Sequence, residues 1–204
     1  MGKVPTAVEL FGRGAEPRDT RERILHVALD LFYGNGFHAV GLDRILAEVG
    51  VTKTTFYNHF PSREDLVLEC VKVRDVWERE AFERAVRARA GYDPRALLLA
   101  IFDVMDDWFN DPRYRGCLFI AASAEFPSRQ DPVHKAAAQH FASMEEQIRL
   151  MAEAAGVEDP AALATSWVLL LEGAVTYRLV TGDDSVAKSA KVVAEQLLAA
   201  QLPA

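Results

Sequence analysis

Apolar residues recur at intervals of three and four along most of the chain, which is the spacing of one face of an α-helix. No segment shows the sustained alternation of apolar and polar residues that marks a β-strand. Glycine and proline residues divide the pattern into segments of helical length. The sequence therefore predicts an all-α chain with about nine helices.

The stretch 42–60 has the pattern of two short helices around a tight turn. The first helix, 42–49, has one apolar face, and Gly50 ends it because glycine adopts the left-handed conformation at little cost. Thr52 is a suitable N-cap for the second helix, which is expected to end before Pro61. The pair has the arrangement of a helix-turn-helix motif.

The second helix of this pair carries a polar outer face. Phe56 and Phe60 are four positions apart and share its buried side. Thr54 and Asn58 point the opposite way, and Lys53 lies near the N-terminal end. Such a face suits the major groove of DNA, where lysine reaches guanine acceptors and hydroxyls reach bases or phosphates. The spacing alone is equally compatible with a solvated helix of an ordinary bundle.

Three runs of residues between positions 20 and 70 together form a recognisable motif: TRERILHVALDLFYGNGF, GVTKTTFYNHF and SREDL. They resemble the DNA-binding domain of the TetR family of bacterial transcriptional regulators. The resemblance implies an N-terminal three-helix DNA-binding domain over 18–65. It also implies a helical domain over 66–204 that binds an effector and forms a homodimer.

The same resemblance assigns roles to seven residues of the motif. The residues expected to contact bases are Lys53, Thr54 and Asn58. Those expected to contact phosphates are Thr55, Tyr57, His59 and Arg63. Gly41 departs from the family pattern, in which Thr or Ser commonly opens this helix, so a phosphate contact there would come from a backbone N–H. Leu46 also replaces a residue that is commonly small.

Composition limits how the chain could bind a polyanion. Half of the 204 residues are hydrophobic, which is enough for one large or two modest cores, and the net charge is −7. Residues 1–70 carry 8 Lys and Arg against 10 Asp and Glu. Attraction to DNA must therefore come from the local placement of charges, which favours a dimer at a defined double-stranded operator over nonspecific binding.

Several other classes of site are not expected. Cys70 and Cys117 are the only cysteines, and with no recognisable secretory signal they predict a cytoplasmic protein. We find no metal-ligand cluster and no nucleophile paired with a base, so we expect no metal, no cofactor and no enzymatic activity. We find no apolar run long enough to span a bilayer, so no membrane partner is expected. Redox sensing by Cys117, which follows Gly116, stays open beside a plain packing role.

The remaining helices are predicted from their start signals. Asp-Pro pairs at 93–94, 131–132 and 159–160 place an N-cap before a proline at the first helical position. These helices are expected to extend to about Asn110, Ala155 and Val180. The other predicted helices cover 63–90, which would connect the two domains, 117–125 and 185–201. Residues 1–17 have no periodicity and predict a flexible arm, in which Lys3 or Arg13 could contact DNA.

The effector site is expected among aromatic residues and methionines at helical spacing, although the same residues could be ordinary core. The residues expected to bind a largely apolar small molecule are Trp77, Phe102, Met105, Phe109, Phe126, His140, Phe141, Met144 and Glu172. Glu172 is unusual because the run WVLLLEGAV around it is apolar, and a buried carboxylate needs a partner. A cationic effector, Arg178 of the partner subunit or a wet dimer edge could each supply one.

The helix around Glu172 is apolar on all sides, so it is expected to be covered twice, once by its own domain and once by a second copy of the chain. Gly173 and Ala174 would allow close approach there. The residues that the final helix would add to this homodimer are Val186, Ala190, Val193 and Leu197.

Taken together, these expectations describe a ligand-responsive repressor that binds a palindromic operator as a homodimer and is released by a small molecule. The alternative is a ligand-binding or protein-interaction module that has lost DNA binding, which the acidic N-terminal part would suit. Activation in place of repression stays open at this point.

Overall fold

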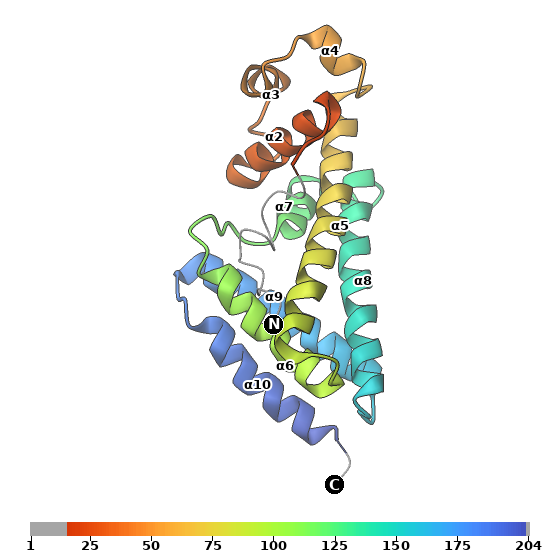
Figure 1. Cartoon of the computed structure of the whole chain (residues 1–204), viewed down its shortest axis with the longest axis vertical. Coiled ribbons are helices and arrows are strands. Elements are labelled where there is room, and N and C mark those ends of the chain that lie inside the picture. The colour runs from red at the N-terminus through yellow and green to blue at the C-terminus, as the bar shows by residue number, and fades with distance from the viewer. Residues whose placement is uncertain (1–15, 203–204) are drawn as a thin grey trace. The chain divides into compact units, whose positions relative to one another are not determined.

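A computed structural model describes residues 16–202 of the chain, and within that range all regular structure is α-helical (Figure 1). Lys3 and Arg13, expected above to contact DNA, lie outside the described residues. The nine helices of the described range are α2 (Thr20–Asn35), α3 (Leu42–Val49), α4 (Lys53–Tyr57), α5 (Arg63–Ala90), α6 (Pro94–Phe109), α7 (Leu118–Glu125), α8 (Pro132–Ala154), α9 (Pro160–Thr181) and α10 (Val186–Ala200). The predicted all-α fold is confirmed.

The helix starts follow the capping signals of the sequence. The Asp93 carboxylate accepts hydrogen bonds from the backbone N–H groups of Arg95 and Ala96, both at 2.9 Å. Asp159 accepts from the N–H of Ala162 at 3.0 Å, and Pro160 follows it at the first helical position. These bonds satisfy donors that have no partner within the helix, which is why each helix begins where it does.

The described chain divides into two compact units. The N-terminal unit comprises residues 16–77 and 117–139, and the C-terminal unit comprises residues 78–116 and 140–202. Helices α5 and α8 each contribute to both units. The expected domain boundary at residue 65 falls in the first turn of α5 and stays a prediction.

Four phenylalanines fill the centre of the N-terminal unit: Phe32, Phe37, Phe56 and Phe60 are each at most 1% exposed. The ring centroids of Phe32 and Phe37 lie 5.2 Å apart, and those of Phe56 and Phe60 lie 5.6 Å apart. The guanidinium carbon of Arg21, on α2, lies 4.9 Å from the centroid of the Phe60 ring, so the segment that follows α4 packs against α2. In Figure 1, α2 lies between α4 on one side and α7 on the other.

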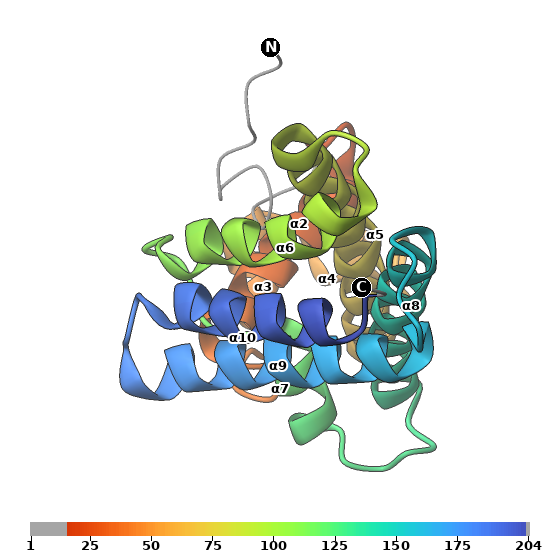
Figure 2. The same ribbon diagram turned by 90° about the horizontal axis from the view of Figure 1, so that it is seen from below.

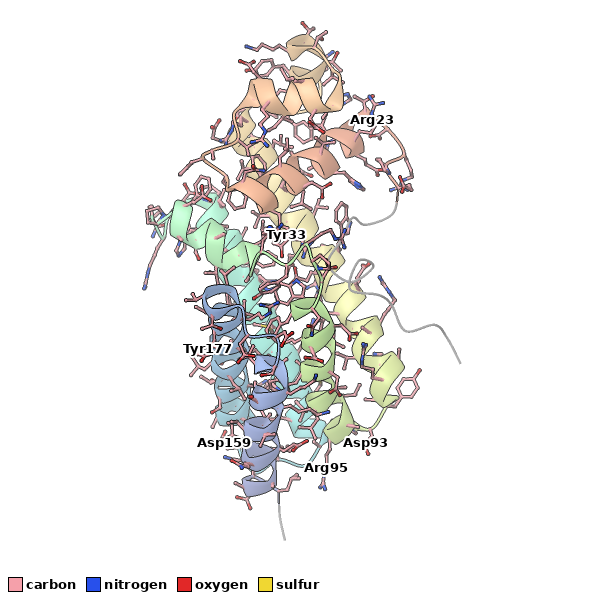
Figure 3. All side chains as sticks on the ribbon, turned by 90° about the vertical axis from the view of Figure 1, so that its left-hand side faces the viewer. Arg23, Tyr33, Asp93, Arg95, Asp159 and Tyr177 are labelled. Atoms are coloured by element: carbon pink, nitrogen blue, oxygen red, sulfur yellow. The ribbon has the colours of Figure 1, made fainter. Side chains whose placement is uncertain are left out.

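In the C-terminal unit, α10 packs against both α6 and α9 (Figure 2). Phe102 of α6 meets Trp167 of α9 edge to face, with ring centroids 5.6 Å apart. Lys191 of α10 donates to both carboxylate oxygens of Asp103 at 2.8 Å. Asp93, Arg95 and Asp159, labelled in Figure 3, lie towards the end of this unit at which α6 and α9 begin.

Helix α4 is shorter than predicted, because it ends at Tyr57 instead of extending to Phe60. The N–H of His59 donates to the carbonyl of Phe56 at 2.9 Å, a bond across three residues that tightens the backbone into a turn. The N–H of Phe60 still reaches the Phe56 carbonyl at 3.0 Å. Phe60 therefore stays on the buried side although it lies outside the regular helix.

The expectation that no segment could span a bilayer is wrong for α9 by length and composition alone. Pro160–Thr181 is long and apolar enough to cross a membrane although it contains Glu172 and Arg178. The core helix of a soluble protein can have the same length and composition. Here α9 packs against α6 and α10. Its Arg178 donates two hydrogen bonds, at 2.9 and 3.1 Å, to the carbonyl oxygen of Phe109 on α6. The helix is therefore part of the helical packing of the C-terminal unit.

Candidate nucleic-acid interface and effector site

The turn between α3 and α4 has the conformation that the sequence predicts. Gly50 lies in the left-handed region with φ 77°, and its N–H donates to the Leu46 carbonyl at 2.9 Å. The hydroxyl of Thr52 accepts a hydrogen bond from the N–H of Thr55 at 3.1 Å and so caps α4. A non-glycine residue at position 50 would adopt this φ only with strain.

Four of the seven residues expected to contact DNA have exposed side chains: Lys53, Thr54, Tyr57 and Asn58. Tyr57 is 54% exposed even though its ring contacts the buried Phe56. Such exposure of a large aromatic ring leaves its hydroxyl available to a partner. Thr55 and His59 are half-buried, and the Thr55 hydroxyl lies 3.0 Å from that of Thr52.

Arg63 has a structural role in addition to the phosphate contact expected for it. Its guanidinium donates to the carbonyl of Val40 at 3.0 Å and to that of Phe37, and its carbon centre lies 5.6 Å from the centroid of the Phe32 ring. The side chain is largely buried. Arg63 thus holds the loop between α2 and α3, and its contact with phosphate stays a prediction.

The first turn of α3 has no side-chain cap. Gly41 is the N-cap residue and accepts only the backbone bond from Ile45, at 3.4 Å. Gly41 has no hydroxyl to offer at this helix start, and a phosphate contact from a backbone N–H there stays a prediction. Asp43 in the same turn lies 3.0 Å from the Lys53 ammonium.

Sequence reasoning missed a contact that Glu125 makes with the loop after α2. The Glu125 carboxylate accepts hydrogen bonds from the N–H groups of Phe37 at 2.8 Å and His38 at 2.6 Å. The His38 ring nitrogen Nε2 lies 2.9 Å from the backbone carbonyl oxygen of Glu125. The ring of Phe126 packs beside both Phe37 and His38. The end of α7 is thereby attached to the loop that leads into α3.

The nine residues of the expected effector site are distributed over both units. Trp77 and Phe126 belong to the N-terminal unit. The residues that belong to the C-terminal unit are Phe102, Met105, Phe109, His140, Phe141, Met144 and Glu172. Among these seven, the three from α6 and His140 are buried, while the other three are half-buried. Their role in effector binding stays a prediction.

Glu172 is half-buried, and one of its carboxylate oxygens lies inside the protein. Its oxygen Oε2 is inaccessible to solvent and has no hydrogen-bond partner among the described residues. Burial raises the pKa of Glu172 to about 7, an effect that the His140 imidazole opposes and the Glu78 carboxylate reinforces. Arg178, considered above as a partner from the second subunit, uses two of its nitrogens on the Phe109 carbonyl of its own chain.

The two cysteines are both buried and reduced. Burial raises the pKa of the Cys70 thiol well above its ordinary value, which makes its thiolate scarce. Cys117 is the N-cap residue of α7 and its side chain caps no backbone N–H. Within residues 16–202, no group of three or more His, Cys, Asp or Glu side chains could hold a metal ion.

Comparison with known proteins places both parts of the chain. The model described as bacterial regulatory proteins, tetR family, matches residues 24–70, and the Tetracyclin repressor-like, C-terminal domain model matches residues 94–193. The HTH-type transcriptional regulator YjdC of Escherichia coli (strain K12) is 26% identical over 182 residues, or 87% of this chain and 93% of YjdC.

One solved structure is similar over most of the chain, and one further relative is similar over a shorter segment. The crystal structure of SCO4454, a TetR-family transcriptional regulator from Streptomyces coelicolor, matches with TM-score 0.84 and 29% identity over 90% of this chain and 96% of that one. The HTH-type transcriptional activator FasR of Mycolicibacterium smegmatis is 42% identical over 53 residues, or 26% of this chain and 24% of FasR.

The fold, the helix-turn-helix geometry and these matches define a DNA-binding transcriptional regulator of the helix-turn-helix class. The matched segments lie in the same order as in the family. The chain belongs to the TetR family of bacterial transcriptional regulators, as the motif around residues 20–70 indicated.

Proposed function

We propose that this regulator is a ligand-responsive repressor that binds a palindromic operator as a homodimer and is released by a small-molecule effector. The observation that carries the proposal is the outer face of α4, where the side chains of Lys53, Thr54 and Asn58 are exposed. The ring of Tyr57 is exposed on the same helix. These side chains supply an ammonium, a hydroxyl and an amide, which are the groups that contact base edges in the major groove. Phosphate contacts from Thr55, Tyr57, His59 and Arg63 would fix the orientation.

The proposed dimer forms through α9 and α10. On α9, Leu169, Gly173, Tyr177 and Val180 recur at helical spacing on one exposed face, and a Cβ added at Gly173 would meet no atom within 4 Å. Ala174, which was expected to contribute to close approach, is buried inside its own unit. An exposed apolar helix face of this kind is typical of a protein–protein interface.

Helix α10 contributes less to this face than its pattern predicted. Val193 is exposed, but Ala190 is buried within the unit, and Val186 and Leu197 are half-buried. Val192, the residue before it, is more exposed than Val193. Two copies joined by α9 and α10 would present two α4 helices to a twofold-symmetric operator, in which the half-sites lie roughly 34–36 Å apart.

The proposed effector is a largely apolar small molecule bound in the C-terminal part of the chain. Seven of the expected contact residues are within one unit, and six of them are aromatic, methionine or histidine. A partly buried carboxylate, Glu172, would supply the polar contact that orients the molecule. We place the protein in the cytoplasm, where both DNA and effector are accessible, and we propose no catalytic role.

The direction of regulation has a second candidate. FasR, which matches the helix-turn-helix part, is named as an activator, so activation is the alternative outcome of operator binding. A ligand-binding module without DNA binding is the other rival, because residues 1–70 have more acidic than basic side chains. The exposed donors on α4 favour DNA binding over that rival.

A gel shift with the DNA upstream of the protein's own gene and of neighbouring genes tests the proposal. We expect a site-specific and salt-sensitive shift, since phosphate contacts release counterions. Lys53→Ala should weaken operator binding about tenfold to a hundredfold and relax sequence preference, whereas Tyr57→Phe should weaken all DNA similarly. Absence of any shift at low salt would favour the module that has lost DNA binding.

A further inference from the structure

An acidic side chain lies next to the lysine that is proposed to contact bases. The carboxylate oxygen Oδ1 of Asp43, in the first turn of α3, lies 3.0 Å from the ammonium of Lys53, the first residue of α4. The two side chains are 82% and 63% exposed, respectively. The hydrogen bond with Asp43 raises the pKa of Lys53 above its ordinary value. The pair is therefore an ion pair on the outer surface of the two motif helices.

The position of this carboxylate has a consequence for any bound DNA. A phosphate backbone is densely charged, so a carboxylate held beside Lys53 is repelled wherever Lys53 approaches the duplex. Asp43 also neutralises part of the field of Lys53 in the free protein. Both effects weaken the attraction between the protein and any DNA until a base contact forms.

The loss of affinity that Asp43 causes is smaller for cognate DNA than for other DNA. A lysine ammonium has three donors, so it can keep one bond to Asp43 while it donates to the O6 and N7 acceptors of a guanine. Asp43 then orients the ammonium towards the base, and the base contact offsets the repulsion. At a site without a suitable acceptor the repulsion remains and nothing offsets it.

We infer that Asp43 is a specificity-determining residue of the α3–α4 motif, which lowers the affinity for non-cognate DNA more than the affinity for the operator. The inference rests on the proposed function, because it takes Lys53 as a base contact. It also explains how a DNA-binding part with 8 basic and 10 acidic residues over positions 1–70 can favour one site.

The test compares Asp43→Asn with the wild-type protein on two probes of equal length, the upstream fragment retained in the gel shift and a random-sequence duplex. We expect the dissociation constant for the random duplex to fall about three- to tenfold and that for the retained fragment to change less than about twofold. The salt dependence on random DNA should steepen by about one unit of slope, because the charge of Lys53 is then no longer offset by a neighbouring carboxylate.

Glu48→Gln provides the matched control, since it removes the same charge from an exposed position on the same helix. Equal effects of Asp43→Asn and Glu48→Gln on the ratio of the two dissociation constants would overturn the inference, because net charge alone would then explain them. In a Lys53→Ala background the effect of Asp43→Asn on that ratio should shrink, and an undiminished effect would also overturn it. Circular dichroism of each variant confirms that the helices are intact.

Failure of the proposed function gives a different result. A wild-type protein that binds both probes equally overturns the operator-binding proposal and the inference together. If the wild-type protein prefers the retained fragment and Asp43→Asn has the same preference, the operator-binding proposal stands. That result overturns only the inference about Asp43.

Discussion

The carboxylate of Glu125 accepts a hydrogen bond from the backbone N–H of His38 at 2.6 Å, although the two residues are 87 positions apart. A second bond comes from the N–H of Phe37, and Arg63 donates to the carbonyls at positions 37 and 40. In the loop between α2 and α3, backbone N–H groups are therefore bound by Glu125 of α7, and backbone carbonyls are bound by Arg63 of α5. Because α3 begins directly after this loop, these bonds set where the helix-turn-helix motif starts.

Glu125→Gln should weaken this arrangement. The Gln side chain has one acceptor oxygen, and its NH₂ group would face an N–H donor, so at least one hydrogen bond is lost. We expect the free energy of unfolding to fall by about 1–3 kcal/mol, as for a bond to a charged group. Urea denaturation measures this loss, and hydrogen exchange of the Phe37 and His38 amides locates it.

The control for this variant is Glu153→Gln, which removes the same charge from an exposed position on α8 where the carboxylate pairs with Arg149. That variant should leave amide exchange at positions 37 and 38 unchanged. Exchange that is equally slow in wild-type and Glu125→Gln proteins would show that the carboxylate does not hold the loop.

Gly36→Ala should be destabilising for a related reason. Gly36 has φ 87° and ψ 159°, a region that only glycine adopts readily, and an added Cβ would lie 3.0 Å from the Glu125 oxygen Oε1. We expect a loss of about 1–3 kcal/mol in the free energy of unfolding. Gly34→Ala is the matched control, because Gly34 lies within α2 and its Cβ would meet nothing within 4 Å.

Thermal unfolding of the two alanine variants should separate them clearly. Gly34→Ala should keep or raise the melting temperature, since alanine is the better helix former. Gly36→Ala should lower it by several degrees. Equal melting temperatures would mean that the loop changes its backbone conformation without cost.

The helices were predictable because their signals are local. Asp93 and Asp159 cap donors two or three residues away, so the sequence around each one is sufficient to place a helix start. Gly50 likewise acts on its own backbone. The same holds for the motif as a whole, whose exposed and buried positions follow from helical spacing.

The contacts across the N-terminal unit were not predictable from spacing. Glu125 reaches a loop far away in sequence, and nothing next to it in the chain distinguishes it from a solvated residue. Asp43 and Lys53 meet only because the turn at Gly50 brings two helices together. Arg74, a charged residue of α5, is only 4% exposed, and its guanidinium carbon lies 5.6 Å from the centroid of the Tyr33 ring. Each of these depends on tertiary packing.

Glu172 should make the stability of the protein depend on pH. Its pKa is about 7 in the folded protein against an ordinary value of 4.5, so between these values the native state holds a proton that the unfolded state releases. The free energy of unfolding should therefore fall as the pH rises from about 4.5 to about 7, by at most about 3 kcal/mol. Below this window both states are protonated and the contribution is fully present.

In Glu172→Gln the side chain is neutral at every pH, so the fall in the free energy of unfolding between about pH 4.5 and pH 7 should disappear. Urea denaturation at pH 5 and pH 8 should show the variant gaining stability relative to the wild-type protein as the pH rises. Glu195→Gln, at an exposed position of α10, corrects for the change in net charge. Parallel pH profiles for wild-type and Glu172→Gln would mean that folding does not raise the pKa of Glu172.

The exposed face of α9 predicts which substitutions separate the proposed dimer. Leu169 is 71% exposed and Val180 is 78% exposed, which is unusual for apolar side chains on one helix face. Leu169→Asp would place a carboxylate in an apolar interface and should raise the dimer dissociation constant by at least about thirtyfold. Leu150→Asp is the control, because Leu150 is 49% exposed on α8, outside the proposed interface.

Light scattering coupled to size-exclusion chromatography at a few micromolar protein measures the effect. Leu169→Asp should shift the mass towards one chain, and Leu150→Asp should keep that of two. A monomeric Leu169→Asp protein should also lose operator binding, since each half-site alone retains only part of the phosphate contacts. Dimers of unchanged stability in Leu169→Asp and Val180→Asp would place the interface elsewhere on the C-terminal unit.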